Sequence, residues 1–246
     1  MSDNRRAGRL LAEGLVILVS VLAAFFMEGW RDDRELDREL RDELESVMRE
    51  LERNRELARL EIGALDRVIG AGESVAATLD EAQGQPTVEI PDTLAWLVTG
   101  WNVSFTPSLG AVDALLASGR LSRIENEELR LGLAGLRETF EDSFEEEVFA
   151  REINVGQVVP LLGETYRLDF SIGNEFFASG GPGRTPQERI TAVPLTSRGD
   201  VRFPTRLEVR NAIVHRMAWL SSARSEFVSL RPLLDDLIRL VEEEIN

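Results

Sequence analysis

The first thirty residues place an apolar run between a basic tail and a strongly charged segment. The run from Gly14 to Met27 contains no charged residue. At about 1.5 Å per residue it would cover about 21 Å, which is less than the roughly 30 Å of a hydrocarbon layer. Extended to Leu10–Trp30 it would cover about 31 Å. Glu13 and Glu28 would then lie near the membrane interfaces, where carboxylates cost less, and Trp30 would lie where interfacial aromatics gather. We therefore expect residues 1–30 to form a tail and a single transmembrane anchor.

Two other interpretations of this segment stay open. A cleavable signal peptide would use the arginines before the run as its basic region and the small residues of "VLAA" for cleavage. Phe25–Met27 continue the apolar run past that point, which weakens this interpretation. A buried helix of a soluble domain is the third interpretation.

The apolar run also has two different sides. At about 100° per residue, one stripe carries the small residues Ser20 and Ala24, which let helices approach closely in lipid. A carboxylate on the same stripe prefers protein or water to lipid. The stripe is thus a candidate self-association face, a candidate pore lining, or an ordinary part of a span. The residues assigned to membrane assembly are Glu13, Ile17, Ser20, Ala24, Met27 and Glu28, with Trp30 as the interface anchor.

A long charged helix is expected to follow the anchor. Between Trp30 and Pro86 there is no proline, and apolar residues such as Leu36, Leu40, Leu44 and Val47 recur at steps of four, four and three. Such steps add to an eleven-residue repeat, which keeps an apolar stripe nearly straight on a helix. The spacing predicts one helix over about 31–80 whose apolar seam packs against the rest of a helical domain spanning 31–246.

The remaining chain predicts further helices separated by breakers. Residues 81–91 are expected to form a connector, and 92–100 and 110–119 short helices, with Gly119 as a C-terminal cap. Asn126 is expected to cap a helix over about 127–160, and Thr205 with Glu208 forms a capping-box pattern before a helix over about 205–244. Residues 164–203 are irregular, with short strands or an ordered loop as alternatives. The expected fold class is all-α: an N-terminal transmembrane helix continuing into an elongated antiparallel helical bundle.

Composition and charge exclude several functions. The net charge of −16 argues against nucleic-acid binding and against docking of the helical domain on anionic lipid. The absence of cysteine removes disulfides and thiolate chemistry. The single histidine, His215, is expected on a helix, as a surface or core residue. The acidic residues between Glu141 and Glu147 are interpreted as a solvated face. We assign no catalytic, cofactor-binding or metal-binding residue, expect no cofactor, and do not expect an enzyme.

Three segments resemble a family of uncharacterised bacterial single-span membrane proteins. They are the opening "AEGLVILVSVLAAFFMEGWRDDRELDREL", the segment "FTPSLGAVDALLASGRLSRIENEELRLGLAGL" and the later "LEVRNAIVHRMAWL". Glu13, Trp30, Ser118, Gly119 and Asn211 occupy positions of the family pattern. The chain departs from it where Glu28 replaces an asparagine and where Glu13 and Gly14 are in swapped order. The resemblance implies a membrane anchor followed by a helical domain, without a known reaction.

The function expected from these observations is a membrane-anchored, self-associating helical interaction protein, acting as a scaffold, sensor or accessory subunit. The alternative is a homo-oligomeric ion-conducting pore. The expected partners are membrane lipid, further copies of the chain and another membrane protein, but no nucleic acid. The expected location is the bacterial inner membrane. The short arginine-bearing N-terminus favours an extracytoplasmic C-terminal domain, whereas the count of basic residues after the span favours the opposite side.

Overall fold

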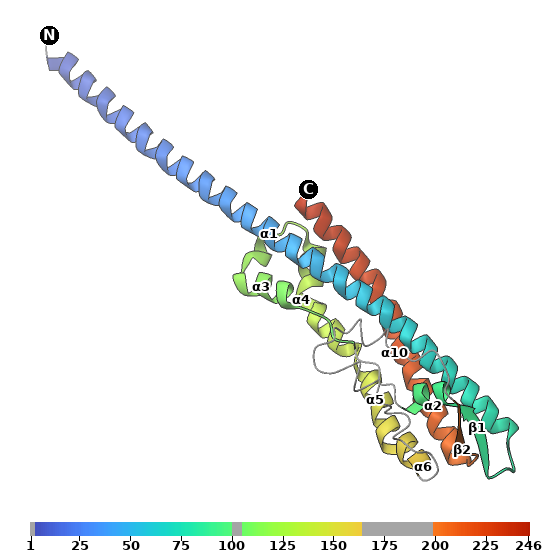
Figure 1. Cartoon of the computed structure of the whole chain (residues 1–246). Coiled ribbons are helices and arrows are strands. Elements are labelled where there is room, and N and C mark those ends of the chain that lie inside the picture. Colours follow the sequence, from blue (N-terminus) through green and yellow to red (C-terminus); the bar gives the residue numbers. More distant parts are fainter. Residues whose placement is uncertain (1–2, 100–104, 164–198) are drawn as a thin grey trace.

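The protein is an elongated helical rod with one helix projecting far beyond the rest, as the computed structural model shows (Figure 1). The structure describes residues 3–99, 105–163 and 199–246, with side chains described from Ser20 onward. Helix α1 (Asp3–Glu81) forms one side of the body and extends past it toward the N-terminus. The described residues are mostly helical, as the sequence predicts.

The apolar seam of α1 packs into the body from Leu40 onward. Leu44, Val47, Leu51 and Leu65 are almost completely buried, and the first of the seam residues, Leu36, is still exposed. The eleven-residue spacing keeps these side chains on one face, so a straight helix can bury all of them against the same partners. The seam predicted from the sequence is therefore confirmed.

The partner of α1 along most of the body is α10 (Leu207–Ile245), which runs antiparallel to it. Three ion pairs mark their alignment: Arg210 with Asp80 at 2.7 Å, Arg55 with Asp235 at 3.0 Å, and Arg224 with Asp66. The side chain of Met217 in α10 packs directly against Gly72 in α1, where an added Cβ would lie 2.2 Å from the Met217 sulfur.

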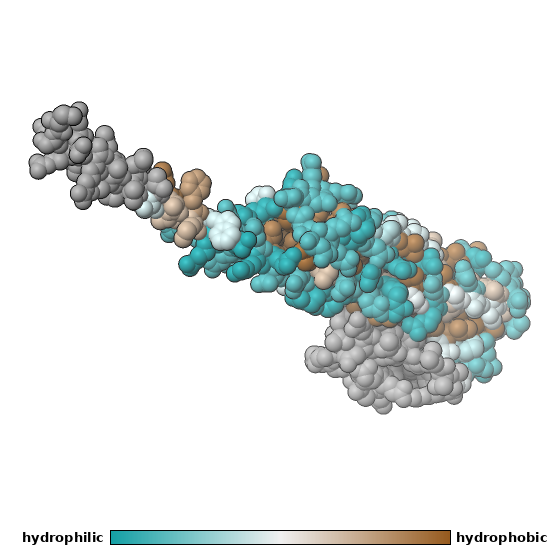
Figure 2. All heavy atoms as spheres, turned by 90° about the horizontal axis from the view of Figure 1, so that it is seen from above, coloured by the Kyte–Doolittle hydropathy of each residue, from teal (hydrophilic) through white to brown (hydrophobic). Residues whose placement is uncertain are grey.

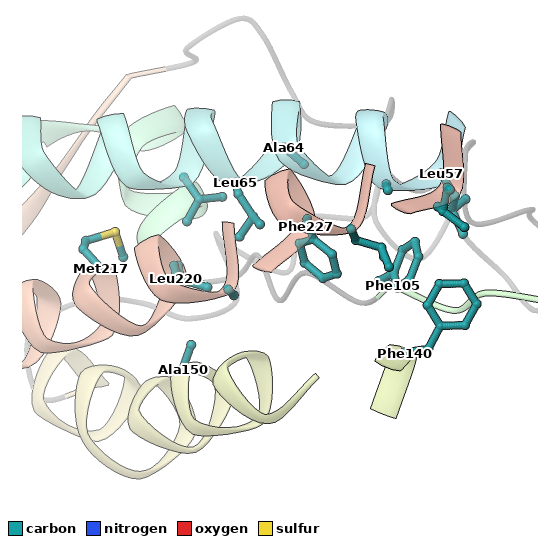
Figure 3. Close-up of a cluster of buried hydrophobic side chains, with 14 of the residues drawn as sticks. Leu57, Ala64, Leu65, Phe105, Phe140, Ala150, Met217, Leu220 and Phe227 are labelled. Atoms are coloured by element: carbon teal, nitrogen blue, oxygen red, sulfur yellow. The ribbon is translucent and has the colours of Figure 1, made fainter. Parts of the chain in front are cut away.

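A second layer of helices covers the other side of α10 (Figures 1 and 3). It consists of α4 (Glu127–Asp142), α5 (Glu145–Ile153), the π-helical turn η2 (Asn154–Val158) and α6 (Val159–Gly163). Helix α10 thus lies between α1 and this layer, and the core lies along both of its buried faces.

The helix predicted over about 127–160 is divided in the structure at Ser143 and Phe144. Phe144 N–H bonds to Glu141 O at 3.2 Å, which closes a tight turn instead of continuing the α-helix. A continuous helix would stack acidic side chains four residues apart, such as Glu141 with Glu145, and such pairs repel. The turn also brings the Phe144 ring to 5.8 Å from that of Phe105.

Three short helical elements, α2 (Asp92–Thr99), α3 (Gly110–Ser118) and the 3-10 turn η1 (Arg120–Arg123), complete the bundle. Gly119 ends α3 with a φ of 75°, as predicted, and Asn126 caps α4 by accepting the Leu129 N–H at 3.0 Å. Between the layers, the ring of Phe105 lies 5.0 Å from that of Phe227 and 5.8 Å from that of Phe140 (Figure 3).

Beside the helices, which agree with the predicted all-α class, the described residues contain a two-stranded antiparallel sheet. Strand β1 (Thr87–Pro91) pairs with β2 (Asp200–Pro204), with Val88 opposite Phe203 and Ile90 opposite Val201. Within the predicted connector 81–91, residues 82–86 form turns, whereas Thr87–Pro91 form β1, because the fully buried Ile90 and Phe203 make the pairing favourable. Of the irregular segment predicted over 164–203, residues 164–198 lie outside the described part of the chain.

The start of α10 also differs from the predicted capping box. Arg206 occupies the N-cap position without a side-chain cap. The hydroxyl of Thr205 instead donates to the backbone carbonyl of Gln85, and its N–H bonds to Pro86 O at 3.3 Å. Thr205 therefore links the end of β2 to the residues just before β1, and it does not cap the helix.

Candidate functional site: the projecting amino-terminal helix

The projecting part of α1 exposes large apolar side chains. Every residue from Ser20 to Glu39 is exposed, and burial against the body begins at Leu40. The exposed fraction reaches 77% for Phe26 and 70% for Met27. Figure 2 shows this hydrophobic segment between the grey N-terminal end and the hydrophilic body. Exposed apolar groups of this size, gathered on one segment, mark a surface that meets something apolar.

These apolar side chains surround the helix instead of forming one stripe. Phe25, Phe26 and Met27 are consecutive, so they point about 100° apart and together cover more than half of the circumference. Val21 and Leu22 are each about half exposed one turn earlier. An amphipathic helix that docks on one protein surface needs a single apolar face, whereas a helix apolar all round suits apolar surroundings on every side.

Trp30 marks the polar end of the apolar segment. Its ring lies 4.0 Å from the guanidinium carbon of Arg34, one turn further along α1. The indole thus follows the apolar segment in the helix and contacts a cation on its C-terminal side. Such a position is typical of a tryptophan at the boundary between lipid and water.

The residues predicted for membrane assembly divide into two groups. The structure places Ser20, Ala24, Met27 and Glu28 on the exposed projecting helix. The side chains of Glu13 and Ile17 lie outside the described part, although the helix backbone includes both residues. Among the residues that the structure describes, no helix combines the length and the apolarity needed to cross a membrane.

The body end nearest the projecting helix is held by ion pairs between η1 and α1. Arg120 pairs with Glu39 at 2.5 Å and with Glu43, and Arg123 pairs with Asp37 at 2.9 Å. Arg123 also lies 3.8 Å from Asp33, three residues beyond Trp30. These contacts hold the body against the base of the projecting helix and thereby limit the angle between them.

A buried polar cluster that sequence reasoning missed fixes the start of α3 on α1. Glu50, 2% exposed, accepts hydrogen bonds from the Ser108 hydroxyl at 2.6 Å, from Ala111 N–H at 2.9 Å and from Val112 N–H at 3.1 Å. Its carboxylate therefore satisfies amides at the N-terminus of a helix, where negative charge is favourable. Asn54, one turn later, donates to Ser108 O at 2.7 Å and accepts from Ser108 N–H at 2.9 Å.

The signal for this cluster in the sequence is weak. Glu50 and Asn54 share the buried face of α1 with the leucine seam, so their positions interrupt an apolar pattern. The long runs of acids and arginines around them conceal that interruption, because most charged residues of α1 face solvent.

The structure also places His215 and Glu147, two titratable residues that the sequence analysis considered. His215 is exposed on α10, and its Nε2 accepts a hydrogen bond from Trp219 Nε1 at 3.2 Å. Glu147 departs from the predicted solvated acidic face, because its carboxylate is largely shielded from water. This burial raises the pKa of Glu147 to about 7, although the hydrogen bond from the Phe105 backbone and the charge of Arg151 act in the opposite direction. The Oε1 atom of Glu147 is buried and has no hydrogen-bond partner among the described residues.

No protein-family model, no curated protein and no solved structure matches this chain.

Proposed function

We propose that this protein is a membrane-anchored, self-associating helical interaction protein, with the N-terminal part of α1 as its anchor and the bundle as the part that meets other proteins. The observation that carries the proposal is the exposed apolar segment Val21–Met27 of α1. It lies on the part of the helix that projects beyond the body, and its side chains cover several sides of that helix. Leaving a large apolar side chain exposed to water costs roughly 1.5–3 kcal/mol of free energy relative to burying it, and insertion into lipid removes that cost.

Three further observations support an anchor that enters lipid. The helix continues without a break through the apolar run predicted as a span over Leu10–Trp30. The Trp30–Arg34 pair lies where the apolar segment meets the charged one. The body carries most of the net charge of −16, so it has no affinity of its own for an anionic surface and depends on the anchor.

Flotation of the full-length chain with phosphatidylcholine liposomes tests the anchor. The native chain is expected to float and to resist alkaline extraction. Replacing Val21 and Leu22 by aspartate places two charges near the centre of the span, where each costs about 2.5–3.5 kcal/mol, and flotation is expected to fail. The matched control places aspartate at Leu131 and Leu207, which are similarly exposed on the body. Flotation of the Val21/Leu22 variant, or loss of flotation in the control, would contradict the proposal.

Self-association is tested by the mass of the full-length chain in nanodiscs. Ala24→Leu adds bulk to the predicted small-residue stripe and is expected to lower the mass of the assembly. Gly29→Leu adds bulk on the opposite side of the same exposed helix and is expected to leave the mass unchanged. Equal masses for the native chain, Ala24→Leu and Gly29→Leu would contradict a role of the small-residue stripe in self-association. If the assembly conducts ions and Glu13→Ala alters the flux, the pore becomes the better description.

The side of the membrane follows from a labelling experiment. Because the chain has no cysteine, Leu131→Cys introduces a single thiol on an exposed site of α4. If the body is extracytoplasmic, a membrane-impermeant maleimide is expected to label this thiol in intact spheroplasts. Labelling only after lysis would place the body in the cytoplasm.

A further inference from the structure

Helix α6 and the first turns of α10 lie at the end of the body far from the projecting helix (Figure 1). A groove lies between the η2–α6 segment and α10. Its volume is about 550 Å³, which is within the range of small-ligand sites. The apolar part of its lining comes from Pro160, Leu161 and Ala212. Residues with polar side chains line the groove on both walls: Gln157 from η2, and Glu208, Asn211 and His215 from α10.

Contacts around the groove hold its two walls in place. Near the start of α10, Arg206 Nη2 donates to the backbone carbonyl of Leu161 at 3.2 Å. Near His215, the rings of Phe149 and Trp219 pack with their centroids 4.8 Å apart. The π-helical turn that carries Gln157 is anchored by Asn154, whose side chain donates to Thr99 O at 2.9 Å. π-helical turns inside α-helices are frequent at functional sites.

The polar lining has a definite chemical character. Among the described residues that line the groove, Glu208 carries a formal charge, so its carboxylate is the group that would attract a cation. The neighbouring Arg206 guanidinium is engaged by the Leu161 carbonyl. Because His215 Nε2 accepts the Trp219 N–H, the neutral imidazole carries its proton on Nδ1 and can donate to an acceptor. Asn211 and Gln157 supply amide groups of both kinds. A ligand with a positive group and a neutral carbonyl would use all of these.

We propose that this groove is a binding site for a small peptide-like cation, in which an ammonium or guanidinium group meets Glu208 and a carbonyl meets the imidazole and amide groups. The site is separate from the membrane anchor and does not rest on its role. Because Glu208 is exposed, its attraction is partly screened by water and salt, and binding in the millimolar range is expected.

The single histidine of the chain makes the test direct. With ¹³C-labelled histidine, the full-length protein in zwitterionic micelles gives imidazole signals from His215 alone. Titration with N-acetyl-L-argininamide in 150 mM NaCl, a concentration chosen to screen diffuse attraction to the acidic protein, is expected to shift these signals saturably. N-acetyl-L-glutaminamide, which has the same backbone and no charge, is expected to bind about fivefold to tenfold more weakly.

Variants on α10 decide whether the groove is responsible. Glu208→Gln is expected to weaken argininamide binding about fivefold to tenfold, and Asn211→Ala a few-fold. The control, Glu226→Gln, removes an exposed carboxylate of the same helix outside the groove and is expected to leave binding unchanged. A shift that does not saturate, equal binding of the neutral amide, or equal weakening by Glu208→Gln and Glu226→Gln would overturn the proposal. Asn211→Ala keeps the test valid if the charge change at Glu208 disturbs the fold.

Discussion

The buried carboxylate of Glu50 gives the sharpest stability prediction. It accepts three hydrogen bonds, from the Ser108 hydroxyl and from the Ala111 and Val112 amides, and it is 2% exposed. Glu50→Ala would remove the acceptor and leave these three donors without it. Hydrogen bonds to charged groups contribute about 1.5–3 kcal/mol, and each buried donor left unpaired costs about 1–3 kcal/mol. Because the substitution also removes the desolvation cost of the carboxylate, we expect a net loss of about 3 kcal/mol.

The loss is expected to be local before it is global, because Glu50 holds one short helix. In hydrogen–deuterium exchange in micelles, Glu50→Ala is expected to exchange faster than the native protein in α3 (Gly110–Ser118). The exchange rates of α10 are expected to change less, because the contacts of α10 are intact in the variant. Urea unfolding followed by circular dichroism gives the change in the free energy of unfolding. Glu50→Gln keeps an acceptor oxygen but loses the charge, so about half of the effect is expected.

The matched control is Glu52→Ala, two residues away on the exposed face of α1. It is expected to change the free energy of unfolding by less than about 0.5 kcal/mol. The reasoning fails if Glu50→Ala is as stable as the native chain, or if it destabilises the protein without faster exchange in α3.

Two further substitutions test packing and protonation. Gly72→Ala is expected to lower the free energy of unfolding, measured in urea, by about 1–2 kcal/mol, because the new Cβ would lie 2.2 Å from the Met217 sulfur. Gly63→Ala, with nothing within 4 Å, is expected to raise it by about 0.5–1 kcal/mol. Equal effects of the two substitutions would contradict the packing of the Met217 side chain against Gly72. Burial raises the pKa of Glu147 from 4.5 to about 7, so the folded state holds this proton more tightly than the unfolded state does. Its contribution to the free energy of unfolding is complete below about pH 4.5 and is lost as the pH rises through 7, by roughly 3 kcal/mol in all. Glu147→Gln is expected to remove that decline in urea titrations at pH 5 and pH 8, and an unchanged decline would refute the assignment.

The parts of the fold that follow from local chemistry were predictable from the sequence. The seam of α1 could be derived because its leucines repeat at a helical spacing and one face of a helix has to be buried. Gly119 and Asn126 could be assigned as caps because only a few residue types satisfy free amides and carbonyls at helix ends. The apolar run that includes Phe25–Met27 was also readable, although its exposure depends on where the body ends.

Other features were decided by contacts between residues far apart in the chain. Strand β1 forms because Ile90 and Val88 meet residues more than a hundred positions later, and nothing local distinguishes them from a connector. Thr205 and Glu208 fit a capping box in the sequence, but in the structure the Thr205 hydroxyl donates its hydrogen bond to the distant Gln85 carbonyl. Glu147 belongs to an acidic run that looks solvated, and only the tertiary structure shows that its carboxylate is largely shielded from water beside the Phe105 backbone.

The sequence by itself determined that this is a helical chain with an apolar N-terminal segment, because helix periodicity and hydrophobicity are properties of neighbouring residues. Only the tertiary structure decided which charged residues are buried, which face of α10 meets the η2–α6 segment, and where α1 leaves the body. Those outcomes depend on long-range packing. A carboxylate such as Glu50 becomes a structural acceptor only when a distant helix brings its amides to it.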